Sequence, residues 1–491
     1  MRRGLRATAT LAGAPPRGKC FARRSAQVEE TVRASVLIVG PICCVSCALI
    51  AAACSGTPAT GFGSGVSGSS SGGFNGASSS GGGSGSGSGI VGSSSGTPPT
   101  LGTGQPDSGP PPAGTCNATD PNADADKDGW SIAQGDCNDC DPNVNPGAID
   151  VLRQNDGGPP TWGDEDCDGK PGDSAMPCDT GLMLADVDPN DGAKAIELCQ
   201  KATITDKKYG VISANYVRAD GTAFATPGTQ VGIESAFGTN VHVQGGANML
   251  VLGTGAARAT GQPGACATLS CQIQTGTPPA GFPQDDPTCP KTAAIFDDVA
   301  LELQVRVPTN ATGYSFNFKF YSYEFPDWVC DPKGWNDQFI TWVNPPPMGA
   351  YVPPGTTSGG NISFDNNKHP VSVNLGFFDV CDPSSPTRFA TGCHKSSGAT
   401  CPATPSPYCP LGTNDLAGTG FDTLDKAGPA GATRWLQTTA PAQPGSVITI
   451  RFAIWDAGNG QYDSTALVDN FQWVATGGVP AVGTAPVPVP K

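Results

Sequence analysis

Charged residues and histidine are scarce in this sequence. Lysine, arginine, aspartate and glutamate make up 14% of the chain, acidic residues outnumber basic ones by 43 to 28, and the formal net charge is −15. A surface of this sign repels phosphate backbones and attracts cations, so nucleic acid is not expected as a partner. The three histidines, His242, His369 and His394, form no H-E-x-x-H pattern, which argues against a zinc protease.

An uncharged apolar run occupies residues 34–53, with Arg33 before it and three alanines ending at Ala53 before Cys54. A basic residue, an apolar stretch and small residues in this order are typical of an export signal. With a cysteine after the small residues, the segment resembles the lipobox of bacterial lipoproteins, although Ala51 stands where Leu is usual. The resemblance implies that residues 1–53 are a lipoprotein signal region and that Cys54 carries lipid. We therefore expect an exported protein, anchored in a membrane at the outer membrane or cell surface.

Two other features bear on this segment. The basic region before the apolar run is long for a signal, which suggests a translation start nearer Val28 or Val32. The alternative is a transmembrane helix, since about twenty apolar residues can span a bilayer. Pro41 and the Ala-Ala-Ala-Cys ending argue against that alternative.

Residues 54–115 are rich in glycine, serine and proline. Such a composition predicts a flexible lipid-anchored tether, with a root-mean-square span of roughly 45 Å. Beyond Cys54, the chain holds fourteen of its 19 cysteines, which is an even number. This number indicates an oxidising compartment and allows up to seven disulfides, whose connectivity the sequence leaves open.

An acidic module is predicted over residues 116–178. The segment 124–129 reads Asp-Ala-Asp-Lys-Asp-Gly, and carboxylates at every second position closed by a glycine suit a turned calcium loop. Position 12 of an EF-hand loop would be Gly135 rather than Glu, so the loop is not an EF-hand. The candidate metal ligands are Asp124, Asp126, Asp128, Asp136, Asp139, Asp141, Asp164, Asp166 and Asp168.

The order D-x-D-x-D-G, G-D-C, N-P-G-A and D-x-D-C-D-G in this module resembles the MopE-type metal-binding motif and the calcium repeats of thrombospondin. The resemblance implies metal binding, and a set of carboxylates and amides favours a hard ion, so we expect Ca²⁺. Cys137 and Cys167 are expected to pair and hold the two acidic segments together. Alternatives are a zinc site built on Cys137 and Cys140 with Cys167 and Cys178, and a solvated acidic linker without metal.

The large domain, residues 179–476, is predicted to be mainly β. A short helix is expected near Asp191–Ala202, after which apolar and polar residues alternate with a period of two. Strands are predicted at 299–307, 314–320, 338–343, 361–364, 371–378, 447–455 and 466–474. Many short strands without intervening helices indicate a jelly-roll-like β-sandwich. Residues 477–491 are expected to be a Pro-rich tail without a membrane anchor.

Two motifs in this domain resemble the core of choice-of-anchor L domains. They are Tyr323–Cys330 with Trp335–Phe339, and the segment Val447–Asn470. The resemblance implies an exported surface protein. The acids around these motifs form a second candidate metal site: Glu324, Asp327, Asn336, Asp337, Asp456, Asp463 and Asp469. The alternatives for these residues are turn-capping hydrogen bonds and a glycosidase-like carboxylate pair.

Together these features predict a non-catalytic cell-envelope lipoprotein with calcium-stabilised extracellular modules. Its role would be structural, adhesive or matrix-binding, with extracellular matrix, a glycan or a surface protein as partner. One alternative is a carbohydrate-binding surface protein that stacks sugars on exposed Trp328, Trp335 or Trp455. The other is a secreted glycoside hydrolase.

Overall fold

In the computed structural model, the described residues are 116–487 except 117, 156, 174–175, 285–288, 290–291, 293, 330–332, 375–376, 383–408 and 423–429. The expected signal region, Cys54 and the tether lie outside them. Among the residues that the structure describes, no helix is both long and apolar enough to cross a bilayer.

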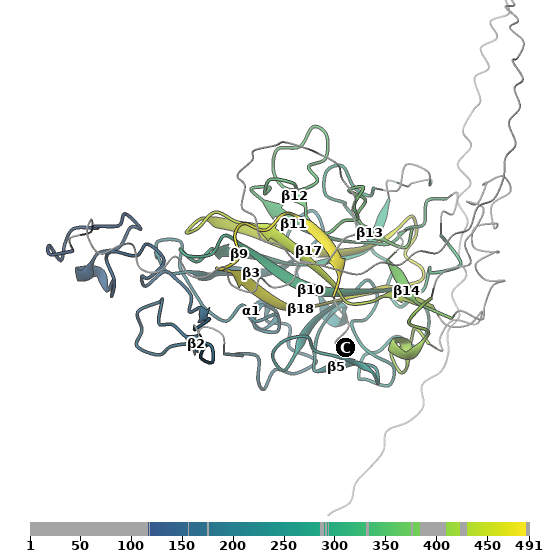
Figure 1. The fold of residues 1–491 in the computed structure, drawn as a ribbon. Helices are drawn as coiled ribbons and strands as arrows, with labels where there is room; N and C mark the ends of the chain where they lie inside the picture. The colour runs from purple at the N-terminus through teal and green to yellow at the C-terminus, as the bar shows by residue number, and fades with distance from the viewer. Residues whose placement is uncertain are drawn as a thin grey trace, which may run out of the picture. The chain divides into compact units, whose positions relative to one another are not determined.

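Two antiparallel sheets make up most of the described chain (Figure 1). The eight-stranded sheet has the order β14-β15-β10-β18-β7-β4, with β16 joined to β10 and β19. Its strands are β4 (Val231–Glu234), β7 (Met249–Gly253), β10 (Gly313–Ser322), β14 (Phe378–Val380), β15 (Gly431–Thr433), β16 (Leu436–Pro441), β18 (Ser464–Val474) and β19 (Gly483–Pro486).

The seven-stranded sheet has the order β12-β11-β17-β9-β3, with β13 joined to β11 and β8 to β9. Its strands are β3 (Gly210–Val217), β8 (Thr275–Gly276), β9 (Ile295–Arg306), β11 (Gln338–Asn344), β12 (Gly360–Asn361), β13 (Val371–Ser372) and β17 (Val447–Ala457). Two small hairpins lie outside both sheets, β1 (Leu152–Arg153) with β2 (Thr161–Trp162) and β5 (Ala236–Phe237) with β6 (Val241–His242).

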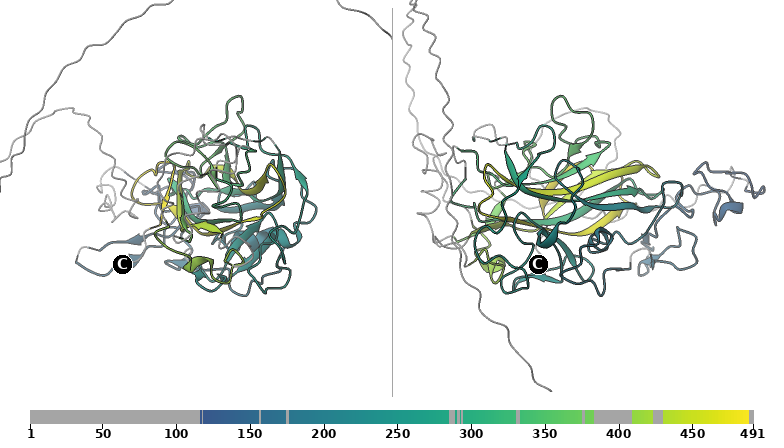
Figure 2. Two further views of the ribbon diagram at one scale, coloured as in Figure 1. Left: turned by 90° about the vertical axis from the view of Figure 1, so that its right-hand side faces the viewer. Right: turned by 180° about the vertical axis from the view of Figure 1, so that it is seen from behind.

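The two sheets pack face to face as a β-sandwich (Figure 2). Phe316 of β10 meets Phe452 of β17 with ring centroids 5.0 Å apart, and Phe318 meets Phe339 of β11 at 4.9 Å. The alternating apolar residues of β9 and β17 supply much of this core. Burial of such faces is the main favourable term in folding. The predicted mainly-β sandwich is confirmed.

Strand β10 departs from the predicted alternation, because all ten of its residues are buried. A second apolar cluster, which includes Phe237, Tyr321 and Phe421, covers the face that was expected to be polar. Lys319 on that face is fully buried, and its Nζ lies 2.7 Å from a carboxylate oxygen of Asp415. The ion pair with Asp415 therefore neutralises a lysine buried on the outer face of the sheet, beneath the second cluster.

Other predicted boundaries shift. Helix α1 spans Pro189–Lys194 only, with the Asp188 side chain accepting from the Asn190 N–H at its start. The chain then turns through Glu197 at a φ of +67°, which ends the expected longer helix. Residues 483–486, expected to lie in a free tail, form β19 and pair with β16.

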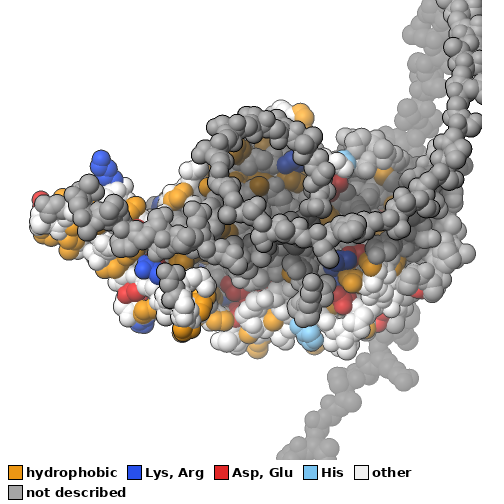
Figure 3. Space-filling model, in the orientation of Figure 1, with side chains coloured by type: hydrophobic (Ala, Val, Ile, Leu, Met, Phe, Trp, Pro, Cys, Tyr) orange, Lys and Arg blue, Asp and Glu red, His pale blue; other side chains and the backbone are white. Residues whose placement is uncertain are grey.

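On the face shown in Figure 3, exposed hydrophobic side chains are scattered among polar ones.

Candidate metal-binding sites

The first acidic loop is held by hydrogen bonds from its own backbone. Asp124 accepts from the N–H groups of Lys127 and Gly129 at 2.6 and 2.9 Å. Asp126 accepts from the N–H of Asp128, and Asp128 from that of Trp130. Each is a carboxylate bonded to a backbone group a few residues ahead, which is the local preference of aspartate in turns. Gly129 closes the loop at a φ of +97°, a region that glycine adopts without strain.

The second acidic loop, residues 164–169, repeats this pattern. Asp164 accepts from the Gly169 N–H at 3.2 Å, and Asp166 from the N–H of Asp168 at 3.1 Å. Asp168 accepts from the Lys170 N–H, and Gly169 has a φ of +84°. The two D-x-D-x-D-G segments therefore fold alike, a repeat that follows from their shared sequence.

Around each loop the carboxylates converge. Oxygens within 4.8 Å of one another come from Asp124 with Asp126 and Asp139, and from Asp126 with Asp128 and Asp136. Around the second loop they come from Asp150 with Asp164 and Asp166, and from Asp166 with Asp168 and Asp173. Each group gathers three acidic side chains, which is a suitable ligand set for Ca²⁺.

Buried oxygens without a partner distinguish the first loop from an ordinary set of turns. Asp126, Asp128, Asp136 and Asp139 each use Oδ1 as an acceptor, while Oδ2 is buried and has no hydrogen bond. Asp136 and Asp139 are only 3% and 2% exposed. Buried polar atoms are normally satisfied, so this arrangement fits a cation held between the free oxygens.

The electrostatics of the loops agree with that fit. Burial raises the pKa of Asp126 to about 6, and the charge of Asp128 adds to the effect. Burial also raises the pKa values of Asp128 and Asp166 to about 6. A raised carboxyl pKa means that the bare loops disfavour their own charge, which a divalent cation would relieve.

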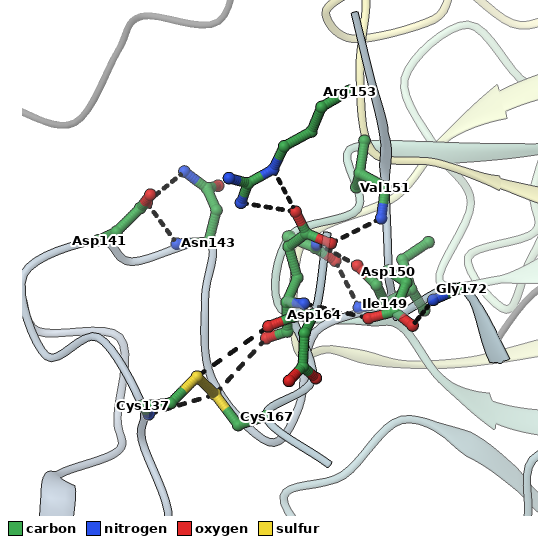
Figure 4. Close-up of polar contacts among 12 residues, drawn as sticks. Cys137, Asp141, Asn143, Ile149, Asp150, Val151, Arg153, Asp164, Cys167 and Gly172 are labelled. Atoms are coloured by element: carbon green, nitrogen blue, oxygen red, sulfur yellow. Dashed lines mark hydrogen bonds and ion pairs between the residues drawn. A yellow bond between two sulfur atoms is a disulfide. The ribbon is translucent and has the colours of Figure 1, made fainter. Parts of the chain in front are cut away.

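Disulfides frame the module. Cys137 is bonded to Cys167, which ties the segment after the first loop to the second loop (Figure 4). Cys140 is bonded to Cys116. Cys178 is bonded to Cys199. The alternative of a zinc site on Cys137, Cys140, Cys167 and Cys178 is therefore wrong, because disulfide sulfurs are not thiolate ligands.

The module is attached to the sandwich by polar contacts. Asn145, which is fully buried, accepts from the Thr309 hydroxyl at 2.7 Å. Asn310 bonds both the N–H and the carbonyl of Ile149, at 3.0 and 2.8 Å. These contacts start from Asn145 in the N-P-G-A segment and from Ile149 directly after it, so this stretch connects the loops to the larger fold.

Within the module the structure differs from the sequence prediction at three acids. Asp141 accepts from the backbone and side chain of Asn143 and belongs to none of the carboxylate groups found among the described residues. Asp150 and Asp173 do belong to such groups although no motif marked them. Asp150 also accepts from the N–H groups of Glu165 and Gly172 (Figure 4).

A second concentration of acids, here called the strand-end cluster, lies where β11, β17 and β18 begin or end. It comprises Asp337, Asp456 and Asp463 with Glu324. Asp337 accepts from Ser464 Oγ at 2.5 Å and from the Ala457 N–H at 3.0 Å. Its own N–H donates to Glu324 Oε2 at 3.2 Å. Both carboxylate oxygens of Asp456 are buried without a hydrogen bond.

Burial dominates the charge state of this cluster. It raises the pKa of Asp337 to about 7 and that of Asp463 to about 8, and it raises that of Asp456 well above its usual range. Asp297 on β9, which no motif indicated, adds to the repulsion, and burial raises its own pKa to about 6. The cluster requires protons or a cation to neutralise it.

The remaining predicted members of the second site lie differently. Asn336 is buried and accepts from the Asn374 N–H at 3.0 Å, while Asp327 is half-buried in the turn after Glu324. Asp469 lies apart, with its carboxylate on the turn between β6 and β7. Trp455, suggested as an exposed sugar-stacking residue, is fully buried in the core, so that expectation is wrong.

Comparisons with protein-family models, curated proteins and solved structures found no match.

Proposed function

We propose that this chain is an exported, non-catalytic surface protein, held at the cell envelope by lipid on Cys54 and stabilised by Ca²⁺ in its acidic module. Its role is structural, adhesive or matrix-binding. The apolar run before Cys54 and the tether after it support the anchor. The disulfides of the described part support an oxidising compartment.

The observation that carries the calcium part is the set of buried, unpartnered Oδ2 atoms of Asp126, Asp128, Asp136 and Asp139. Ca²⁺ takes six to eight oxygen ligands, and Asp126, Asp128 and Asp136, whose ligand oxygens lie within 4.8 Å of one another, would supply three of them. The module contributes few apolar side chains to the core, so ion binding would provide much of its folding free energy. In the same proposal, the strand-end cluster holds a further Ca²⁺ through Asp337, Asp456 and Asp463.

Calcium dependence is tested on the purified full chain by calorimetric melting in EDTA and in excess Ca²⁺. We expect a higher melting temperature in Ca²⁺, and reversal on chelation, because a ligand that binds only the native state stabilises it. Mg²⁺ is the matched control, since it demands a smaller octahedral shell and retains its water. Identical melting curves in EDTA and Ca²⁺ would remove the calcium part of the proposal.

The anchor is tested separately in cells. Metabolic labelling with a fatty acid, followed by mass spectrometry of the mature N terminus, should place the lipid on Cys54. A Cys54→Ser variant should lose the label and leave the membrane fraction. An unmodified Cys54, or an intact bond between residues 53 and 54, would contradict the anchor while leaving the calcium sites unaffected.

One observation favours a second candidate, carbohydrate binding. A cavity of about 700 Å³ is lined by Trp162 and Trp473 together with polar residues such as Gln244 and Gln472. Aromatic faces beside polar groups suit sugar rings. Trp162 is 43% exposed, so Trp162→Ala should remove glycan-array binding without unfolding the chain. Trp473 packs on Tyr314 and Phe471, which makes it unsuitable for this test.

A further inference from the structure

A third group of acids gathers around the turn between β6 and β7, away from the module loops and the strand-end cluster. Asp469 accepts from the N–H groups of Gln244 and Gly245. Asp179 accepts from the N–H groups of Ala247 and Asn248, at 2.7 and 2.5 Å. Two carboxylates from distant parts of the chain thus hold the same short turn.

Glu197 completes the group. Burial raises the pKa of Glu197, and the charges of Asp469 and Asp179 raise it further. Its two carboxylate oxygens are buried and have no hydrogen bond. The nearby N–H groups of Asn470 and Phe471 are already used, since they donate to Asp469 Oδ1 and to the Ile196 carbonyl oxygen.

The glycines of the turn leave room between these carboxylates. A Cβ on Gly246 would lie 2.5 Å from Glu197 Oε1 and 2.6 Å from Asp179 Oδ2. A Cβ on Gly245 would lie 2.9 Å from the side-chain oxygen of Asn470 and 3.2 Å from Glu197 Oε1. Oxygens from three side chains therefore converge on a space that any residue other than glycine would fill.

A ligand is indicated by an observation independent of this crowding. Asp179 is fully buried, yet its Oδ1 has no hydrogen-bond partner. Within the described part of the chain, no Lys or Arg forms an ion pair with Asp179, Glu197 or Asp469. An unpaired buried carboxylate costs several kcal/mol, and three together need a counter-charge.

We propose that Glu197 and Asp179 bind a divalent cation beside the turn that Asp469 holds, with Ca²⁺ as the preferred ion. The ligands are all oxygens, with the Asn470 side chain as a third ligand, and such a hard set favours Ca²⁺ over softer metals. Glu197, Gly245, Gly246 and Asn470 line the 700 Å³ cavity, which gives the ion a route from solvent and room for water ligands. The cation would join the segments on either side of α1 to β18 and to the β6–β7 turn.

The test counts bound ions in the full chain by equilibrium dialysis against radioactive Ca²⁺. Glu197→Gln keeps the size of the side chain and removes its charge, so it should lose one equivalent of Ca²⁺ or bind it at least about tenfold more weakly. Asp179→Asn should do the same. Asp141→Asn is the matched control, since Asp141 lies outside all three acidic groups and should leave the count unchanged.

The melting temperatures of the variant and the wild type in EDTA provide a second readout. Without metal, Glu197→Gln should melt at the same temperature as the wild type or above it, because burial and the charges of Asp469 and Asp179 disfavour a charged carboxylate at this position. An unchanged Ca²⁺ count in both variants would overturn the proposal. So would a Glu197→Gln variant that fails to fold in EDTA, since the carboxylate would then serve the fold without any ion. The loops of the acidic module are intact in these variants, so failure here is distinguishable from failure of the proposed function.

Discussion

Asp136→Asn tests the charge argument for the acidic module most directly. The substitution keeps the Oδ1 that accepts from the Asn138 N–H at 2.8 Å and replaces the unpartnered Oδ2 by an amide. Asp136 lies within 4.8 Å of ligand oxygens on Asp126 and Asp128. Two like charges at that separation repel by about 3 kcal/mol at an effective dielectric constant of about 20.

Neutralising Asp136 removes two such repulsions. Water around the half-exposed Asp126 and Asp128 screens them, so the expected gain in the free energy of unfolding is on the order of 2 kcal/mol. In EDTA the variant should therefore be more stable than the wild type, with a melting temperature a few degrees higher. In Ca²⁺ the lost ligand should reduce the calcium-induced gain by at least about 1.4 kcal/mol, which is a tenfold loss of affinity.

Differential scanning calorimetry of both proteins, in EDTA and in millimolar Ca²⁺, measures the two effects. Asp141→Asn is the control, because Asp141 bonds Asn143 outside the carboxylate groups. If Asp136→Asn melted below the wild type in EDTA, the carboxylate would be stabilising as a simple hydrogen-bond acceptor. An unchanged response to Ca²⁺ would also refute the reasoning.

Three further outcomes are expected. The double variant Cys137→Ala with Cys167→Ala should lose about 3–4 kcal/mol of unfolding free energy in a denaturant titration, since it opens a loop with a sequence separation of 30. Its Ca²⁺ affinity should also fall, and an unchanged affinity would show that the disulfide does not hold the acidic loops in their binding conformation. Asp415→Asn should cost about 3 kcal/mol or more at pH 7, because it leaves the Lys319 ammonium buried without its carboxylate. Burial lowers the pKa of Lys319, so at high pH the unfolded chain binds more protons than the folded chain does. The stability of the Asp415→Asn variant should therefore rise with pH, and a stability that does not change with pH would contradict this. In EDTA, the native state holds a proton on Asp463 up to a pKa of about 8, so stability should fall as pH rises from about 4 to 8, and Asp463→Asn should flatten that slope in thermal melts.

Local sequence patterns were sufficient to predict the central strands of the fold. The alternation in residues 299–307 and 447–455 corresponds to β9 and β17, whose apolar faces form the centre of the sandwich. Side-chain direction in a strand depends only on the parity of the position, so sequence suffices there. The same logic failed for β10, where the covering cluster comes from segments far along the chain.

The acidic loops show the same division. The D-x-D-x-D-G segments at 124–129 and 164–169 could be recognised because aspartate bonds its own neighbouring backbone and glycine closes the turn. Asp150 and Asp173 could not be recognised, since nothing in their immediate neighbours marks them. Their place beside the second loop depends on how the chain returns after the β1–β2 hairpin.

The sequence by itself determined the apolar run before Cys54, the mainly-β pattern and the two acidic loops, because each depends on residues a few positions apart. The tertiary structure alone decided which acids meet. It separates Asp469 from Asp456 and Asp463, which are near it in sequence, and brings it to Glu197 and Asp179. The physical reason is that a carboxylate's charge acts over a few ångströms of space, and the distances across a sandwich are set by strand pairing and core packing rather than by position in the chain.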